Sequence, residues 1–136
     1  MRAVIDTNVL VSGVLNPHGA PGRIVDAILA RSFVVLYDDR ILAEYRAVLI
    51  RPVFGFRHTE VDAFVDFAAA TGESVVAAIL AVVLPDPDDM PFLEVASAAR
   101  ADALVTGNVR HFKPRRGGHN VNVCSPAEFL RRLETA

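Results

Sequence analysis

The sequence predicts an α/β fold, a three-layer α/β/α sandwich with a central parallel sheet of four to five strands. Short apolar runs that fit buried strands alternate with segments whose apolar residues recur at helical spacing. Strands that alternate with helices form parallel sheets covered by helices on both faces. The chain has 136 residues, 52% hydrophobic and 22% charged, which suits one well-cored domain. We therefore expect a single domain over residues 1–136.

The first half of the chain is expected to contain two strands and three helices, with the first helix between the two strands. The strands are short apolar runs at 3–5 and 33–37. Turn-forming residues at 16–22 indicate a loop between them. The helices have apolar residues at helical spacing and cover about 21–31, 39–50 and 59–70.

The second half begins with an ambiguous segment at 73–84. Its valines favour a strand and its alanines favour a helix, and we expect a strand, if only over its last half. Two prolines make 85–89 a loop. The remaining elements are a helix at about 91–100, a strand at 103–106, a basic glycine-rich loop to 118, a strand at 121–123 and a C-terminal helix opened by the capping box 125–128.

Charge and cysteine content exclude several classes of protein. The net charge of −2 leaves no overall electrostatic footprint for nucleic acid, so a polyanion would have to meet a local patch. The single cysteine, Cys124, excludes an internal disulfide and suits a reducing cytosol. The longest apolar stretch, 75–84, is about half of what a bilayer requires. We expect a cytoplasmic protein with no leader peptide and no membrane partner.

Two expected strands end in similar polar triplets. Asp6, Thr7 and Asn8 follow the first strand, and Thr106, Gly107 and Asn108 follow the fourth. In open α/β sheets, ligands lie beyond the carboxyl ends of the strands. These residues are therefore placed for chemistry, although Asp6 or Thr7 could equally cap the next helix and the later triplet could be an ordinary turn.

Glu44 breaks the pattern of its helix. The apolar stripe there consists of Ile41, Tyr45, Val48 and Leu49. Glu44 lies three residues after Ile41 and four before Val48, so it points with the stripe. A carboxylate on a buried face is costly unless it is paired or bound to a metal. The alternatives are a salt bridge to Arg40 or Arg23, or a stripe edge that reaches solvent.

The loop before the helix expected at about 91–100 adds three more acids, Asp86, Asp88 and Asp89. Taken alone, such residues are more often turn and cap residues than ligands. Of the three, Asp89 is the preferred candidate for a metal ligand, because it stands immediately before the helix. Asp6, Glu44 and Asp89, gathered in one crevice, would repel each other unless a cation lay among them. Hard oxygen ligands select Mg²⁺ or Mn²⁺, ions that promote phosphodiester hydrolysis.

A positive patch directly follows Asn108. It consists of Arg110, His111, Lys113, Arg115, Arg116 and His119. The patch lies at the same edge of the sheet as the proposed site, so Arg110, Lys113 and Arg115 are expected to hold a phosphate backbone. A solvated loop is the alternative.

Four short motifs follow one another along the chain. They are Asp6-Thr7-Asn8-Val9-Leu10, Leu42-Ala43-Glu44-Tyr45, Asp86-Pro87-Asp88-Asp89 with Phe92-Leu93-Glu94, and Leu104-Val105-Thr106-Gly107-Asn108. In this order they resemble the PIN-domain family, and most closely the toxin components of VapBC-type toxin–antitoxin operons. The resemblance covers nearly the whole chain, through to the segment 125–130.

The resemblance implies a Mg²⁺- or Mn²⁺-dependent endoribonuclease that hydrolyses RNA phosphodiester bonds. It implies that Asp6, Glu44 and Asp89 hold the metal, directly or through water, and serve catalysis together with Asn108. Asn8 and Thr106 would then position those carboxylates or the attacking water beside the substrate. The implied partners are a cognate antitoxin and further copies of the chain, in a homodimer or higher even oligomer.

The sequence departs from the family pattern at one place. Many relatives carry an aspartate near Asn108 or His111, and this chain has no acid at either position. The departure favours an alternative, in which a catalytically weakened domain regulates by binding RNA or protein. The retained Asp6, Glu44 and Asp89 favour the nuclease. A nuclease of DNA or of structured nucleic acid would need the same site chemistry.

Overall fold

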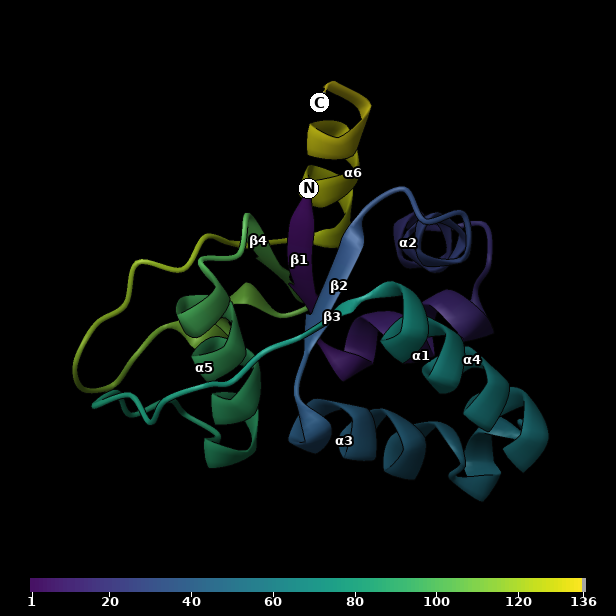
Figure 1. Cartoon of the computed structure of the whole chain (residues 1–136), viewed down its shortest axis with the longest axis horizontal. Helices are drawn as coiled ribbons and strands as arrows, with labels where there is room; N and C mark the ends of the chain where they lie inside the picture. Colours follow the sequence, from purple (N-terminus) through teal and green to yellow (C-terminus); the bar gives the residue numbers. More distant parts are fainter. Residues whose placement is uncertain (136) are drawn as a thin grey trace.

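Over residues 1–135, which the computed structural model describes, five short strands form one parallel sheet with helices on both sides (Figure 1). The strands are β1 (Arg2–Ile5), β2 (Val34–Tyr37), β3 (Glu73–Ser74), β4 (Ala103–Val105) and β5 (Val123–Cys124). They lie in the order β3-β2-β1-β4-β5, which makes β1 the central strand. The expected three-layer α/β/α class is confirmed.

Six α-helices and three short 3-10 helices join these strands in the described part of the chain. The α-helices are α1 (Thr7–Leu15), α2 (Ala20–Leu29), α3 (Asp39–Leu49), α4 (His58–Thr71), α5 (Met90–Ala99) and α6 (Pro126–Thr135). The 3-10 helices are η1 (Pro52–Phe54), η2 (Pro87–Asp89) and η3 (Val109–Phe112). In Figure 1, α5 lies on one side of the sheet, and α2 and α4 lie on the other.

The central strands are buried on both faces, as expected for a parallel sheet between helices. Ala3, Val4 and Ile5 of β1 and all of β4 are fully buried, with Val4 paired to Leu104 in the ladder. Such strands are continuous apolar runs rather than alternating ones, which is why the sequence predicted them at nearly these bounds. The free thiol of Cys124 is buried beside them.

The segment expected as a strand at 73–84 is one only at its first two residues. Val75 donates from its amide to the carbonyl of Tyr37, the last residue of β2, at 2.8 Å. Beyond that point the neighbouring strand has ended and α3 has begun, so the segment has no partner to pair with. It crosses the surface irregularly, with Val76 96% and Ile79 94% exposed, and forms one isolated antiparallel bridge, between Val83 and Arg116. The expectation of a strand in the last half is wrong.

The other expected boundaries agree with the structure to within a few residues, but helix α1 was not among the expected elements. The last strand is Val123–Cys124 instead of 121–123, and α6 is capped as expected, because the Glu128 amide donates to the Ser125 hydroxyl at 3.2 Å. None of the helices in the described chain is long and apolar enough to cross a membrane.

Candidate metal and nucleic-acid site

Asp6 lies at the carboxyl end of the central strand, directly before α1. Its side chain is buried and makes no capping hydrogen bond to the helix, although Asp6 occupies the N-cap position. It accepts a hydrogen bond from the Thr106 hydroxyl at 2.8 Å instead. Burial raises the pKa of Asp6, and the Thr106 bond and the first amides of α1 oppose that rise. Asp6 is therefore an oriented carboxylate and not a helix cap.

Glu44 lies on α3 and faces the end of β1. Its neighbour Tyr45 is buried and donates to the carbonyl of Ile5, which fixes α3 across the carboxyl end of the central strand. Glu44 itself is half-buried and accepts a hydrogen bond from the Thr7 hydroxyl. Burial raises the pKa of Glu44, and the charge of Asp6 raises it further.

The salt-bridge explanation of Glu44 is wrong. Arg40 pairs with Asp38 at 2.8 Å and with Glu94 at 2.7 Å. Arg23 pairs with Glu134 at 2.8 Å. Because both arginines are engaged elsewhere, the Glu44 carboxylate has the Thr7 hydroxyl as its one hydrogen-bond partner among residues 1–135.

Asp89 lies at the junction of η2 and α5. Only 15% of its side chain is exposed. Its Oδ2 atom is buried and has no hydrogen-bond partner among the described residues. Burial and the charges of Asp6 and Asp86 raise the pKa of Asp89 to about 6, and Glu44 adds to the rise. A buried carboxylate oxygen without a partner costs free energy, so it calls for a cation or a proton.

The two other acids of this loop are placed differently. Asp86 and Asp88 are exposed. The carboxylate of Asp86 accepts the Asp88 amide at 2.9 Å and so caps η2. Asp86 thus has the turn role that such residues most often have, and Asp89 alone turns inward.

The structure brings Asp6, Glu44 and Asp89 into electrostatic contact from three separate elements. Each pKa is raised, and Asp6 contributes to the rise in both of the others. No three His, Cys, Asp or Glu side chains among residues 1–135 already stand as a metal-binding group. The donor set nevertheless fits a hard divalent cation, because it offers carboxylate oxygens, one of them unpartnered. Binding would require these side chains to close further around the ion.

The turn after β4 interlocks with the turn after β1. Asn8 accepts the Gly107 amide through Oδ1 at 3.1 Å, and the Thr106 hydroxyl accepts the Asn108 amide at 3.0 Å. Thr106 is fully buried, so its hydroxyl joins Asp6 to the backbone of the next turn. The two similar triplets in the sequence therefore lie side by side and hold each other.

The side chain of Asn108 is exposed and contacts His111. Its Nδ2 lies 2.9 Å from His111 Nε2. With the amide as donor, that ring nitrogen is the acceptor, and Nδ1–H is left on the other side of the ring. Nδ1 lies 3.7 Å from Asp89 Oδ2. His111 is a site residue that the sequence showed only as part of a basic patch, because nothing in local spacing reveals its approach to Asp89.

A second feature that the sequence did not reveal is an ion pair between the exposed Arg40 of α3 and the buried Glu94 of α5. Glu94 is 5% exposed and accepts hydrogen bonds from Arg40 at 2.7 Å and from the Leu80 amide at 3.3 Å. The pair ties together the helices that carry Glu44 and Asp89. The sequence offered one sign of this pair, because Glu94 is a charged residue between two buried apolar residues of α5.

The basic residues predicted to bind phosphate are exposed. Arg110, Lys113 and Arg115 lie on η3 and the loop after it. Their side chains make no ion pair with any acid in residues 1–135. These three cations lie on the segment that carries His111, whose ring approaches Asp89, so they can attract a polyanion toward the acidic side chains.

Known proteins resemble this chain in sequence and in fold. Residues 2–110 match the family model described as "PIN domain". The chain is 30% identical to the uncharacterized protein MJ1680 of Methanocaldococcus jannaschii, over 98% of this chain and 92% of that protein.

A solved structure shares the fold at low sequence identity. It is the crystal structure of VapBC2 from Rickettsia felis bound to a DNA fragment from their promoter. The TM-score is 0.57 at 17% identity, and the match covers 92% of this chain and 98% of that one. The arrangement of helices and strands described above therefore recurs in the VapBC2 structure.

Proposed function

Because this chain belongs to the PIN-domain family, we propose that it is a single PIN domain over residues 1–136 that hydrolyses RNA with a divalent metal ion. The observation that carries the proposal is the buried, unpartnered Oδ2 of Asp89, facing the charges of Asp6 and Glu44. Three carboxylates with raised pKa values are poised to exchange protons for a cation.

Asp6, Glu44 and Asp89 would hold Mg²⁺ or Mn²⁺, directly or through water. When bound, such an ion activates water and stabilises the charge that develops on a phosphodiester. Thr106 keeps the Asp6 carboxylate oriented and Thr7 does the same for Glu44. Asn8 holds the Gly107 amide, so the turn that presents Asn108 stays beside the carboxylates, where Asn108 can contact the scissile group.

The proposed substrate is RNA, bound through its backbone. Arg110, Lys113 and Arg115 are exposed beside the acidic crevice and carry charges that no acid of the described chain neutralises. Phosphate contacts position a strand without reading its sequence. DNA would meet the same cations, so cleavage of matched RNA and DNA strands decides between the two substrates.

We propose further that the protein is the toxin of a type II toxin–antitoxin pair. Support comes from the likeness of its fold to that in the VapBC2 structure. The partners are then a cognate antitoxin that covers the acidic crevice and a second copy of the chain, in a cytoplasmic homodimer or higher even oligomer. Expression of the chain alone should arrest growth, and Asp6→Asn should abolish the arrest.

The first experiment is calorimetric titration of Mn²⁺ into the purified chain and into Asp89→Asn. Wild type should bind and the variant should bind at least about tenfold more weakly, since one charge-assisted ligand is lost. Asp62→Asn is the matched control, because Asp62 is an exposed acid on α4. RNA cleavage that needs Mn²⁺ and disappears in Asp6→Asn then tests the reaction. No binding by folded wild type would overturn the proposal.

One observation favours a second function, that of a catalytically weakened regulatory module. Asn108 stands where many relatives carry an acid, and its amide is engaged with His111. An amide contributes no charge to a metal site, so the domain would bind RNA or a partner protein without cutting. RNA binding that persists in the chelated protein, with no cleavage at saturating Mn²⁺, would favour this function.

A further inference from the structure

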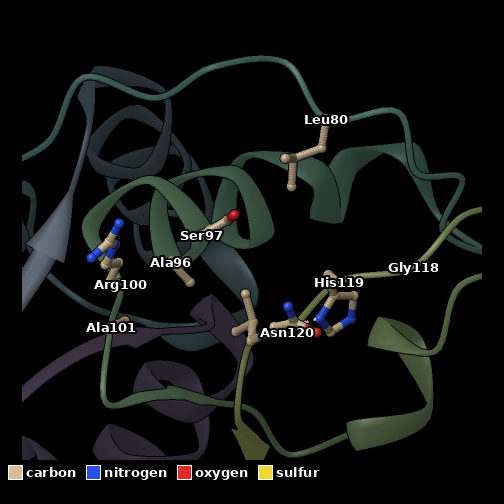
Figure 2. Close-up of a pocket in the computed structure, with 9 residues that line it drawn as sticks. Leu80, Ala96, Ser97, Arg100, Ala101, Gly118, His119 and Asn120 are labelled. Atoms are coloured by element: carbon tan, nitrogen blue, oxygen red, sulfur yellow. Dashed lines mark hydrogen bonds between the residues drawn. The ribbon is translucent and has the colours of Figure 1, made fainter.

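A cavity lies between α5 and two segments that cross the surface. It encloses about 510 Å³. Figure 2 shows Ser97 and Arg100 on or just beyond α5, Leu80 on the segment above them, and His119 and Asn120 on the loop below. The volume lies within the range of small-molecule sites. None of the residues assigned to the acidic site lines it.

The walls of the cavity are held together by specific hydrogen bonds. The Leu80 amide donates to Glu94 of α5 at 3.3 Å, which fixes the upper segment to the helix. Val83 exchanges backbone bonds with the loop, donating to Arg116 at 2.8 Å and accepting from Arg115 at 2.7 Å. A cavity whose walls are held by such hydrogen bonds is preformed, so binding of a ligand carries no free-energy cost for ordering the wall segments.

Gly117 allows the loop to come this close. Its φ is +75°, and a Cβ there would lie 2.4 Å from the Ala81 carbonyl oxygen. Any other residue would push the loop away from the upper segment. Gly118 follows, and a Cβ there would meet nothing within 4 Å, so the loop is not tightly packed at this position.

His119 stiffens the loop and contributes no charge. Its Nδ1 accepts the Val121 amide at 3.1 Å, and its Nε2 lies 2.9 Å from the Phe112 carbonyl oxygen. An acceptor at one ring nitrogen and a donor at the other describe the neutral imidazole. The ring of His119 therefore holds the loop in place, and the positive charge in the cavity lining comes from Arg100.

Three of the polar side chains that line the cavity have no partners within the described chain. The side chains of Ser97, Arg100 and Asn120 form no hydrogen bond or ion pair with residues 1–135. Leu80 and Val121 supply half-buried apolar surface between them. One guanidinium, one hydroxyl and one amide around an apolar floor suit a ligand that has an anionic group, a flat apolar face and a polar edge.

We infer that this cavity binds one nucleotide of single-stranded RNA, outside the cleavage site. Arg100 would hold its phosphate, since a guanidinium matches phosphate oxygens. Ser97 and Asn120 would contact the edge of the base, which single-stranded RNA presents when it is unstacked. The inference rests on the proposed nuclease function for its choice of RNA as the source of the nucleotide.

The position of the cavity relative to Asp89 supports single-stranded RNA as the source of the bound nucleotide. Ser97 lies eight residues beyond Asp89 along α5, about 12 Å at 1.5 Å per residue. The basic loop runs from Arg110, near the acidic crevice, to Gly118 and Asn120 in the cavity wall. A strand of a few nucleotides could follow that loop with its scissile phosphate at one end and the flanking nucleotide in the cavity.

The test is a titration of adenosine 5′-monophosphate into isotope-labelled protein in EDTA, followed by amide chemical shifts. The inference expects shifts at Ser97, Arg100 and Asn120, and binding about tenfold weaker in Arg100→Ala, the effect of one charge-assisted contact. Ser97→Ala is a second variant that leaves the guanidinium in place and should also weaken binding.

Arg31→Ala is the matched control. Arg31, at a φ of 56°, has the same left-handed backbone as Arg100, at 51°, and lies two residues after the end of α2, whereas Arg100 directly follows α5. The control should bind as wild type does. Inorganic phosphate, titrated in parallel, should bind more weakly than the nucleotide.

Cleavage assays separate the failure of this inference from the failure of the proposed function. In an active nuclease, Arg100→Ala should raise KM for a longer oligonucleotide by a larger factor than it raises KM for a dinucleotide. Nucleotide binding at Ser97 and Asn120 without any RNA cleavage would support the cavity and overturn the nuclease. RNA cleavage with no shifts in the cavity, or shifts equal to those from phosphate, would overturn the inference.

Discussion

The Thr106 hydroxyl donates to Asp6 Oδ2 at 2.8 Å and at the same time accepts the Asn108 amide at 3.0 Å. This side chain is fully buried, so water cannot replace either bond. A group at the end of β4 thereby sets the orientation of the carboxylate at the end of β1. The hydroxyl also lowers the pKa of Asp6 against the effect of burial.

Thr106→Val keeps the shape and removes both bonds. We expect the pKa of Asp6 to rise further and Mn²⁺ affinity to fall about tenfold, because a hydrogen bond to a charged group contributes about 1.5–3 kcal/mol. Calorimetric titration measures the affinity. Thr71→Val is the control, since Thr71 contacts only a carbonyl within α4. Equal affinities in Thr106→Val and wild type would contradict the positioning role.

Asp89→Asn should stabilise the metal-free protein at neutral pH. The folded-state pKa of Asp89 is about 6, above the ordinary 3.8. Folding is therefore favoured by protonation of Asp89, and this contribution is lost as the pH rises through 6. The substitution removes the ionised form and should raise the free energy of unfolding by about 1–3 kcal/mol at pH above 6, from about 1.4 kcal/mol per pKa unit.

Thermal unfolding in EDTA measures this effect, and the gain should disappear near pH 4. The exposed Asp62→Asn should show neither the gain nor its pH dependence. A variant that binds metal poorly and yet melts higher has exchanged function for stability, as strained sites do. A lower melting temperature in Asp89→Asn at neutral pH would mean that Asp89 has a structural partner in solution.

Mn²⁺ affinity should rise steeply between about pH 5 and pH 7, because ligands must lose their protons before they bind a metal. Asp89, with a pKa of about 6, dominates this range, and the pKa values of Asp6 and Glu44 are raised as well. Titrations across this range, with the protons released at each pH measured from the buffer dependence of the heat, test the claim. A flat profile would contradict it.

Asn108→Asp restores an acid beside the crevice. A fourth carboxylate should increase Mn²⁺ affinity and RNA cleavage by about tenfold, which corresponds to 1.4 kcal/mol. In EDTA, the same charge should raise the pKa of Asp89 further and lower the melting temperature. Asn108→Ala, which loses the contact with His111 without adding charge, is the control. If only the unfolding temperature changed, Asn108 would lie outside the functional crevice.

Arg115→Gln should weaken RNA binding equally for all sequences, because a phosphate contact carries no base information. The slope of log affinity against log salt should become shallower by about 0.7, the value for one contact with a single strand. Fluorescence anisotropy with Asp6→Asn protein avoids cleavage during the measurement. Arg57→Gln is the control, since Arg57 is exposed and pairs only locally, with Glu60. Identical slopes in Arg115→Gln and the control would remove Arg115 from the interface.

The elements that could be predicted from the sequence are those whose signal is local. The central strands are fully apolar, the helices show periodic stripes, and Ser125 caps α6 through a contact three residues away. Glu44 could be identified because one acid on a buried stripe needs an explanation wherever the helix lies. Asp86 could be assigned its capping role for the same reason, since it accepts an amide two residues away.

The failures concern pairings between distant segments. The strand expected at 73–84 has the composition of a strand, but β2 ends at Tyr37 and leaves it without a neighbour. The Arg40–Glu94 pair spans 54 positions, and the approach of His111 to Asp89 spans 22. No local pattern encodes which side chains meet across such separations.

The sequence by itself determined the alternation of strands and helices, the two polar triplets at strand ends and the acids available for a site. Each of these depends on residue spacing within one helix or strand, where backbone geometry fixes the direction in which the side chain at each position points. Only the tertiary structure decided that Asp89, and not Asp86 or Asp88, turns inward, and that a preformed cavity lies beyond α5. Those outcomes depend on which surfaces pack together, because burial and the loss of hydrogen-bond partners arise only when separate elements meet.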